Sequence, residues 1–468
     1  MSKSDRTPLL RVTSEDSGVL ITVLDRKFSP LAEGIDEVKL HVAPGLYEAR
    51  FEAGSSVREQ LLTVEPGDPV HHIHEQKIAF ATPAPLPHTR SENPEHGQAA
   101  RNISREVHRR LGKGGQLMVF VRDLDLRGRT IPTQGLTLHG PAGQYLNLSD
   151  DSLHGGGVDA GYPPWAGCTY QLDPGHWVVR AIAATGGEVE QTIVVCKGWQ
   201  TQLFVERSRA RLGGRARRPD LADAAVLMAK SDHGFDPQLR DLRAVELARQ
   251  GLRDRRLAID ARQLETMLAG KPRNPMLAIY GAHLLVRRAK PDKRLIGRVA
   301  RNLRSLMGDH PDLRAIELWL GEREVGDFAE PPMLKSSWSI IVKASARRPE
   351  LVPRGSRSAA VTETIIGGGP WLRWRVPRRS EPAVASLSPE QPLGRAIAEV
   401  AAALSGDPKE VLMQASEATP VEASVIALAQ RAGNDAARIS DTEILGSLRI
   451  PRTVAEDTVG AVLERLGD

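Results

Sequence analysis

A short phrase that occurs twice is the strongest constraint on the fold of this chain. APGLYEAR at residues 43–50 recurs as DPGHWVVR at residues 173–180. In both copies a Pro-Gly turn leads into an apolar-alternating run with an aromatic residue at its second position and an arginine at its fifth. Two copies of so specific a pattern predict two copies of one small β module.

Side chains alternate between the two faces of a strand, which assigns the residues of the phrase to an inner and an outer face. The inner residues are Tyr47, Ala49 and Phe51 in the first copy and Trp177, Val179 and Ala181 in the second. Val178, Arg50 and Arg180 are expected on the outer faces. We expect each arginine either to pair with a carboxylate of its own module or to mark an equivalent contact surface.

The 468 residues suffice for about three domains, each with its own core. The pattern predicts a multidomain α+β protein: two small antiparallel β-sandwich modules followed by an all-α helical array and a small helical C-terminal domain. The expected parts are β-sandwich module 1 at 1–80, a Pro-rich linker with a short helix at 81–115, β-sandwich module 2 at 116–206, a basic linker at 207–218, a basic α-helical domain at 219–376, a linker at 377–391 and an acidic α-helical domain at 392–468.

Leucine, alanine, arginine and glutamate recur at helical spacing after Pro219, with proline or glycine stops between the runs. The helices expected in the basic section lie near 220–230, 237–250, 259–269, 275–289, 293–307, 312–320, 332–347 and 356–366.

The net charge of +5 conceals a strong asymmetry along the chain. Residues 1–206 carry 20 Lys+Arg against 25 Asp+Glu, residues 207–380 carry 36 against 19, and residues 381–468 carry 7 against 14. The basic middle section therefore has an excess of positive charge that favours an anionic partner, either an acidic protein surface, nucleic acid or the chain's own acidic tail.

A long run of cations falls on one expected helical hairpin, at 275–307. Its members are Arg287, Arg288, Lys293, Arg294, Arg298, Arg301 and Arg304. Residues 294, 298 and 301 are spaced by four and three, which places them on one helix face. We take these seven residues as the candidate partner-binding set, with an ordinary solvated face as the alternative.

No motif for phosphate, dinucleotide or zinc-peptidase chemistry occurs, and no cofactor is expected. A glycine-rich excursion at 150–168 contains Ser152, His154 and Cys168, which leaves a hydrolase as a third function after a nucleic-acid-associated protein.

His72 and His74 share a strand face without a third ligand, so a polar edge strand is preferred to a metal site. Cys168 and Cys196 are expected to be reduced core residues, with a disulfide as the weaker alternative.

The start of the chain lacks the apolar core of a secretory signal, and no apolar stretch approaches the length of a membrane span. We therefore expect a cytoplasmic protein with no membrane partner.

A helix-turn-helix pattern near the C-terminus has an acidic second helix, which disfavours DNA reading. Residues 351–356, LVPRGS, match the cleavage sequence of thrombin and give a test of loop exposure.

The Pro-Gly-x-aromatic-x-x-Arg strand resembles the β-sandwich modules of the PEGA and carboxypeptidase-regulatory type over residues 8–66 and 116–206. That resemblance implies binding or spacer domains without catalytic residues. The stretch NPMLAIYGAHLL at 274–285 with DHPDLRA at 309–315 is similar to helical regions that accompany effector domains in bacterial conflict systems. Together these features favour a non-enzymatic adaptor or scaffold that binds protein partners in a bacterial multi-component system for defence or signalling.

Overall fold

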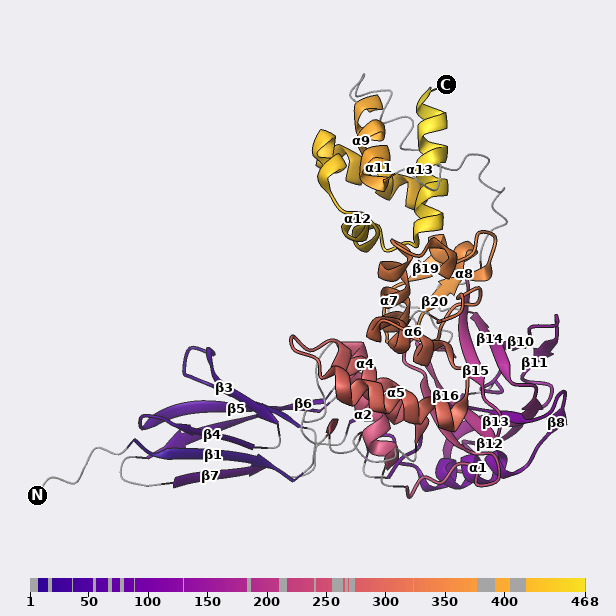
Figure 1. Cartoon of the computed structure of the whole chain (residues 1–468). Helices are drawn as coiled ribbons and strands as arrows, with labels where there is room; N and C mark the ends of the chain where they lie inside the picture. The colour runs from indigo at the N-terminus through magenta and orange to yellow at the C-terminus, as the bar shows by residue number, and fades with distance from the viewer. Residues whose placement is uncertain are drawn as a thin grey trace, which may run out of the picture.

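The computed structural model describes residues 7–467 except 16–18, 36, 54–55, 66–69, 76–79, 88, 129, 183–186, 210–216, 240, 255–263, 266–267, 269–273, 323, 377–391 and 405–417. The predicted linker at 377–391 and most of the helix expected at 259–269 lie outside these residues. The described chain is a mixed α+β protein, with sheets of mainly antiparallel strands in its N-terminal half and helices in its C-terminal half (Figure 1).

The first seven strands form two sheets around one small core. The strands are β1 (Leu9–Ser14), β2 (Leu20–Leu24), β3 (Pro30–Ile35), β4 (Glu37–His41), β5 (Gly45–Ala53), β6 (Ser56–Val64) and β7 (Val70–Glu75). One sheet has the order β4-β1-β7 and the other β3-β2-β5-β6. Leu10 and Val12 from the first sheet pack with Ile21 and Phe51 from the second. Figure 1 shows these strands to one side of the rest of the chain.

The second module also has two sheets. Its strands are β8 (Arg109–Arg110), β9 (Gly115–Asp123), β10 (Leu136–His139), β11 (Tyr145–Asn147), β12 (Leu153–Gly157), β13 (Tyr162–Leu172), β14 (Gly175–Ile182), β15 (Glu188–Val195) and β16 (Trp199–Arg209). One sheet contains β11-β10-β14-β15 and the other contains β12-β13-β9-β16.

Seven strands of the second module repeat the pairings of the seven strands of the first, and β8 and β12 are additional. In the first module β1 is antiparallel to β4 and parallel to β7, and in the second β9 is antiparallel to β13 and parallel to β16. The order β3-β2-β5-β6 is repeated as β11-β10-β14-β15, antiparallel throughout. The duplication seen in one phrase of the sequence therefore extends over a complete set of seven paired strands.

The repeated phrase has the same local geometry in both modules. The Tyr47 hydroxyl donates to the carbonyl of Ala43 at 2.7 Å, and the Trp177 indole donates to the carbonyl of Asp173 at 3.2 Å. In each case the aromatic side chain bonds back four residues and fixes the turn. Ala49, Phe51, Trp177, Val179 and Ala181 are buried as predicted, and Tyr47 is half-buried against its core.

Val178 lies on the outer face of its strand, as predicted. It points away from the main core, yet it is buried, because Val361 and Trp374 pack over it. The outer face of this strand is covered by a segment that comes almost two hundred residues later in the chain.

Strands from beyond residue 206 extend both sheets of the second module. β17 (Arg217–Pro219) and β18 (Ala225–Lys230) pair with β16, while β20 (Arg373–Arg375) pairs with β15 and with β19 (Ile365–Ile366). The helix predicted near 220–230 is wrong, since β-branched and apolar residues there complete a sheet. The helix predicted at 356–366 is reduced to α8 (Arg357–Ala360), and its end is strand β19.

The segment predicted as a Pro-rich linker at 81–115 is corrected by its packing. Ala84 and Leu86 are buried in the main core. The guanidinium of Arg122 donates to the carbonyls of Ser91 and Thr82 at 2.7 and 3.1 Å, and Thr82 donates to the buried carboxylate of Glu246. Prolines hold this stretch extended, but its backbone polar groups are satisfied inside the protein, and it leads directly into α1 (Pro94–Arg105).

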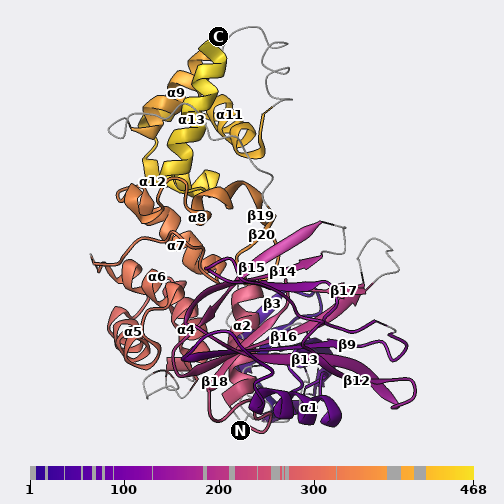
Figure 2. The ribbon, with the colours of Figure 1, turned by 90° about the vertical axis from the view of Figure 1, so that its right-hand side faces the viewer.

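The helices that follow pack on the second module and on one another. They are α2 (Asp241–Asp254), α4 (Pro275–Val286), α5 (Lys293–Met307), α6 (Pro311–Leu320), α7 (Lys335–Ser345), α9 (Leu393–Ala403), α11 (Pro420–Ala432), α12 (Asp441–Leu448) and α13 (Arg452–Gly467). Helices α2, α4 and α5 share the core of the second module. Helices α9 to α13 share a second core with Trp338 and Ile341 of α7, and Figure 2 shows them stacked above α7 and α8.

Candidate partner-binding surface

The cationic hairpin predicted at 275–307 consists of helices α4 and α5. Helix α5 begins after the N-cap Asp292, whose carboxylate accepts from the backbone N–H groups of Arg294 and Leu295. Leu295, Val299 and Leu303 are buried on one side, against the main core. This amphipathic pattern fixes the rotation of the helix and directs the opposite side outwards.

Four of the seven predicted residues, Arg287, Arg288, Lys293 and Arg304, have a partner within the protein. Arg288 pairs with Glu265. Arg304 donates to Glu317 from Nε at 3.0 Å and to Asp309 from Nη1 at 3.0 Å, and the hydrogen bonds with Glu317 raise the pKa of the guanidinium. The Lys293 Nζ lies 5.6 Å from the ring centroid of Trp319. These side chains hold α5 against its neighbours. Arg287, the first residue of the set, is the exposed C-cap of α4.

Arg294, Arg298 and Arg301 are exposed, and no ion pair or hydrogen bond of their side chains is found among the residues that the structure describes. They follow one another at steps of four and three residues along α5, so they form one stripe of about 10 Å. We call Arg294, Arg298 and Arg301 the α5 stripe. The structure therefore distinguishes an unpaired cationic stripe from Arg288 and Arg304, the ion-paired arginines on either side of it.

Arg294, the first residue of the α5 stripe, lies at the end of the helix where the dipole disfavours a cation. The first turn of α5 has no acidic residue but contains Lys293 and Arg294, next to the partial positive charge of the helix N-terminus. Cations at this end weaken a helix, so helix stability does not account for them. Their field and that of the dipole add and attract an anionic group.

The excursion at 150–168 folds as a hairpin of β12 and β13. Ser152 donates to the carbonyl of Leu148 at 2.6 Å, and burial raises the pKa of the Cys168 thiol to about 11. His154 is exposed on β12, opposite Ala166. The thiol is therefore protonated at neutral pH, and the exposed imidazole does not share its buried site.

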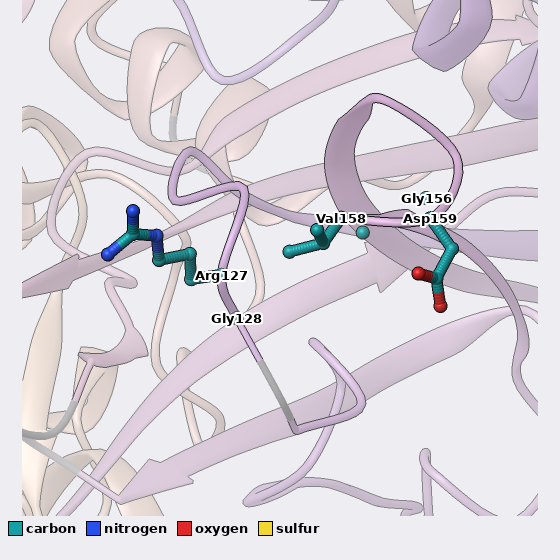
Figure 3. Close-up of a pocket in the computed structure, with 6 residues that line it drawn as sticks. Arg127, Gly128, Gly156, Val158 and Asp159 are labelled. Carbon is teal, nitrogen blue, oxygen red and sulfur yellow. The ribbon is translucent and has the colours of Figure 1, made fainter.

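The tip of this hairpin encloses a cavity of about 540 Å³ with a neighbouring turn (Figure 3). Its lining consists of Arg127, Gly128, Gly156, Gly157, Val158 and Asp159. Figure 3 shows the Arg127 guanidinium directed away from the Val158 side chain. With one apolar side chain and two charged ones, the cavity offers few convergent groups for a small molecule.

The remaining candidate residues have ordinary partners. His72 and His74 both lie 3.1 Å from Thr13 Oγ1 on the neighbouring strand. Across the described residues, no group of three or more His, Cys, Asp and Glu is arranged to hold a metal ion. Cys168 and Cys196 are buried free thiols, which decides against the disulfide alternative.

The acidic C-terminal section does contact the basic section. Arg354 donates from Nε to Asp457 at 2.9 Å and from Nη2 to Glu456 at 2.6 Å. Glu456 also accepts from Arg452 at 2.6 Å. These pairs involve the second helix of the predicted helix-turn-helix, α13, whose acidic groups are thus partly used inside the chain and not by the α5 stripe.

Sequence reasoning missed a buried polar cluster formed by Asp312, Ser337, His283 and His310. All four side chains are at most 1% exposed. They come from α4, α6, α7 and the turn before α6, which are separated by up to 54 residues, so no local pattern reveals them.

The described helices include none that is both long and apolar enough to cross a membrane. The sequence matches no protein-family model, and no curated protein matches it.

Proposed function

We propose that this protein is a non-enzymatic adaptor of a bacterial cytoplasm that docks an acidic surface of a protein partner on the α5 stripe. The main support is that Arg294, Arg298 and Arg301 are exposed and unpaired within the described residues, whereas Arg288, between α4 and α5, and Arg304, near the end of α5, are ion-paired. A stripe of cations on a convex helix fits a carboxylate-rich surface.

The paired sheets of each module support the same reading. Two sheets around a shared core, with a repeated Pro-Gly-aromatic strand, are what β-sandwich binding or spacer modules would present. We infer that these modules position the helical section and its stripe, in keeping with the resemblance to non-catalytic modules.

Nucleic acid is the alternative ligand of the same cations. Binders of single strands add exposed aromatic side chains on which bases stack. Trp319, which contacts Lys293 at the start of α5, is half-buried. This favours an acidic protein over nucleic acid.

A photo-crosslinking amino acid at Ser305, an exposed position one helical turn beyond Arg301, tests the proposal in cells that produce the full chain. We expect a specific protein adduct that disappears in the triple variant R294E/R298E/R301E. The matched control R395E/R431E/R438E makes the same charge change at exposed positions of the C-terminal helices and should retain the adduct.

Two results would overturn the proposal. Adducts to nucleic acid, with salt-dependent binding to DNA or RNA lost in the triple variant, would assign the stripe to the alternative function. A protein adduct of equal yield in both triple variants would show that the stripe does not recognise the partner.

A further inference from the structure

The edge of β15 in the second module is closed by a later segment of the chain. β20 adds to it as an antiparallel strand, with Trp374 opposite Glu190. The indole Nε1 of Trp374 donates to Glu190 Oε2 at 2.7 Å, and the indole is fully buried. The other oxygen, Oε1, accepts from Arg180 at 2.7 and 3.0 Å.

The first module has the same arginine–glutamate pair in the same register. Arg50 lies opposite Glu59 on β5 and β6, as Arg180 lies opposite Glu190 on β14 and β15. Arg50 Nε donates to Glu59 Oε1 at 2.9 Å. Oε2 of Glu59 has no hydrogen-bond partner within the described residues, so the position that the indole fills in the second module is vacant here.

Among the described residues, β6 is also the last strand of its sheet. The order β3-β2-β5-β6 ends at β6, whereas the corresponding order continues from β15 into β20 and β19. The Glu59 side chain is 54% exposed and the Glu190 side chain 11% exposed, which measures what the added strand covers. An exposed edge of nine residues without proline is a ready template for strand addition.

The side chains next to Glu59 suit an aromatic residue better than their counterparts in the second module. Val57 and Leu61 flank Glu59 on the same face and are 50% and 67% exposed. A residue opposite Glu59 on an added strand reaches both through diagonal cross-strand contacts. The equivalent positions of β15 hold Glu188 and Thr192.

We propose that the β6 edge of the first module binds an extended segment of a protein partner as an added antiparallel strand, with a tryptophan opposite Glu59. The indole N–H donates to Glu59 Oε2, and the ring lies between Val57 and Leu61. The segment is neutral or basic, since residues 1–80 carry 13 Asp+Glu against 9 Lys+Arg. This is β-augmentation, in which main-chain hydrogen bonds supply affinity and one side chain supplies specificity.

The direction of the backbone N–H groups in β6 identifies a substitution that removes one hydrogen-bond donor from the open edge. The carbonyl of Glu188 accepts from the N–H of Val376, so the backbone groups of Glu188, and of Glu190 two residues on, face the added strand. By equivalence the N–H groups of Val57, Glu59 and Leu61 face the open edge of β6. Leu61→Pro therefore removes an outward donor while keeping the ladder with β5.

The test uses the full chain and a fluorescent peptide with the sequence of residues 370–376, PWLRWRV, as probe. We expect saturable binding, with slower amide exchange in residues 56–64 of the protein. Glu59→Lys should weaken binding at least about tenfold and Leu61→Pro should abolish it. Glu33→Lys, the same charge change at the exposed opposite edge of this sheet, should leave binding within about twofold. A peptide with Trp374→Phe lacks the indole donor and should bind about fivefold more weakly.

Urea unfolding of each variant separates loss of binding from loss of folding. Binding that survives both Glu59→Lys and Leu61→Pro in folded protein would overturn the proposal, as would exchange protection confined to residues 188–195 or no binding of the peptide. The variant R294E/R298E/R301E should bind the peptide normally. The proposal for the β6 edge and the proposal for the α5 stripe can therefore be tested independently.

Discussion

Ser337 donates a hydrogen bond of 2.6 Å to Asp312, and both side chains are fully buried. The same carboxylate accepts from the backbone N–H groups of Met333 and Leu334 at 3.3 and 2.9 Å. Since the only hydroxyl proton of Ser337 goes to Asp312, His283 Nε2, 3.0 Å away, acts as a donor to the serine oxygen. The cluster thus joins α4, α6 and the start of α7, between the two large cores.

Ser337→Ala tests how much this cluster stabilises the fold. The change leaves Asp312 and His283 without one partner each in a buried site, so we expect a loss of about 1–3 kcal/mol in the free energy of unfolding. Urea denaturation measures the loss. Ser305→Ala, an exposed position on α5, should change stability by less than about 0.5 kcal/mol. Equal effects of the two changes would contradict the role of the cluster.

The buried histidines predict a loss of stability in acid. Burial lowers the pKa of His283 to about 4 and that of His310 to about 3, from 6.5. A lowered folded pKa means that the unfolded chain binds the proton first, so stability is complete above pH 6.5 and falls as the pH drops towards 3 to 4. Burial raises the pKa of Asp312 to about 6, which opposes this loss over the range from about 6 down to 3.8.

His310→Asn isolates one of these titrations. In the native protein the backbone N–H of Asp312 donates to His310 Nδ1 at 3.2 Å. The asparagine side chain offers an acceptor for the same N–H, so the N-cap is retained. We expect the pH dependence of the unfolding free energy between pH 6.5 and 3.5 to flatten by up to one proton, about 1.4 kcal/mol per pH unit. Denaturation at a series of pH values gives this slope. An unchanged slope would show that His310 does not carry the titration.

The two copies of the arginine–glutamate pair provide a matched comparison of stability. Arg180→Gln leaves Glu190 under the covering strand without its charged partner, and we expect a cost of about 2 kcal/mol or more. Arg50→Gln breaks the same pair at an exposed edge, together with a contact of 3.3 Å between Arg50 and the buried Glu48, and should cost less than Arg180→Gln. Thermal unfolding of both variants decides the order. A larger cost at Arg50 would show that the pair at the exposed edge is not the weaker one.

The thrombin-like sequence at 351–356 should resist cleavage in the folded protein. Leu351 and Val352 are at most 1% exposed, and the carbonyl of Val352 accepts from the Thr453 hydroxyl. Arg354, the residue before the scissile bond, is ion-paired to Glu456 and Asp457. We expect no cut at Arg354–Gly355 until urea unfolds this region, as followed by gel electrophoresis. Rapid cleavage of the native chain would contradict the burial of this segment.

Much of the β architecture could be predicted from the sequence, because strand alternation and turn residues are local signals. The inner positions of Phe51 and Trp177 follow from alternation alone. The strand at 225–230 was missed because a short apolar run fits a helix or a strand equally well, and its partner β16 decides between them. The burial of Val178 was not foreseen, because the residue that covers it, Trp374, comes far later in the chain.

The candidate surface was also predicted only in part, because spacing along a helix is a local signal and ion pairing between helices is not. Helical spacing placed Arg294, Arg298 and Arg301 on one face, but nothing near Arg288 or Arg304 in the sequence shows that Glu265 and Glu317 neutralise them. Ion pairing between helices depends on how the helices pack, which is a property of the whole fold.

The sequence by itself determined that a β module occurs twice, that its aromatic residues face inwards, and that a basic section lies between acidic ends. Only the tertiary structure decided that the later strand β20 closes the edge of β15 while β6 remains the end of its sheet. The physical reason is that alternation and spacing act between neighbours along the chain, whereas the closing of an edge depends on which distant segment reaches it. Arg50 and Arg180 are equivalent in sequence, but a later strand covers the pair of Arg180 with Glu190, whereas the pair of Arg50 with Glu59 is exposed.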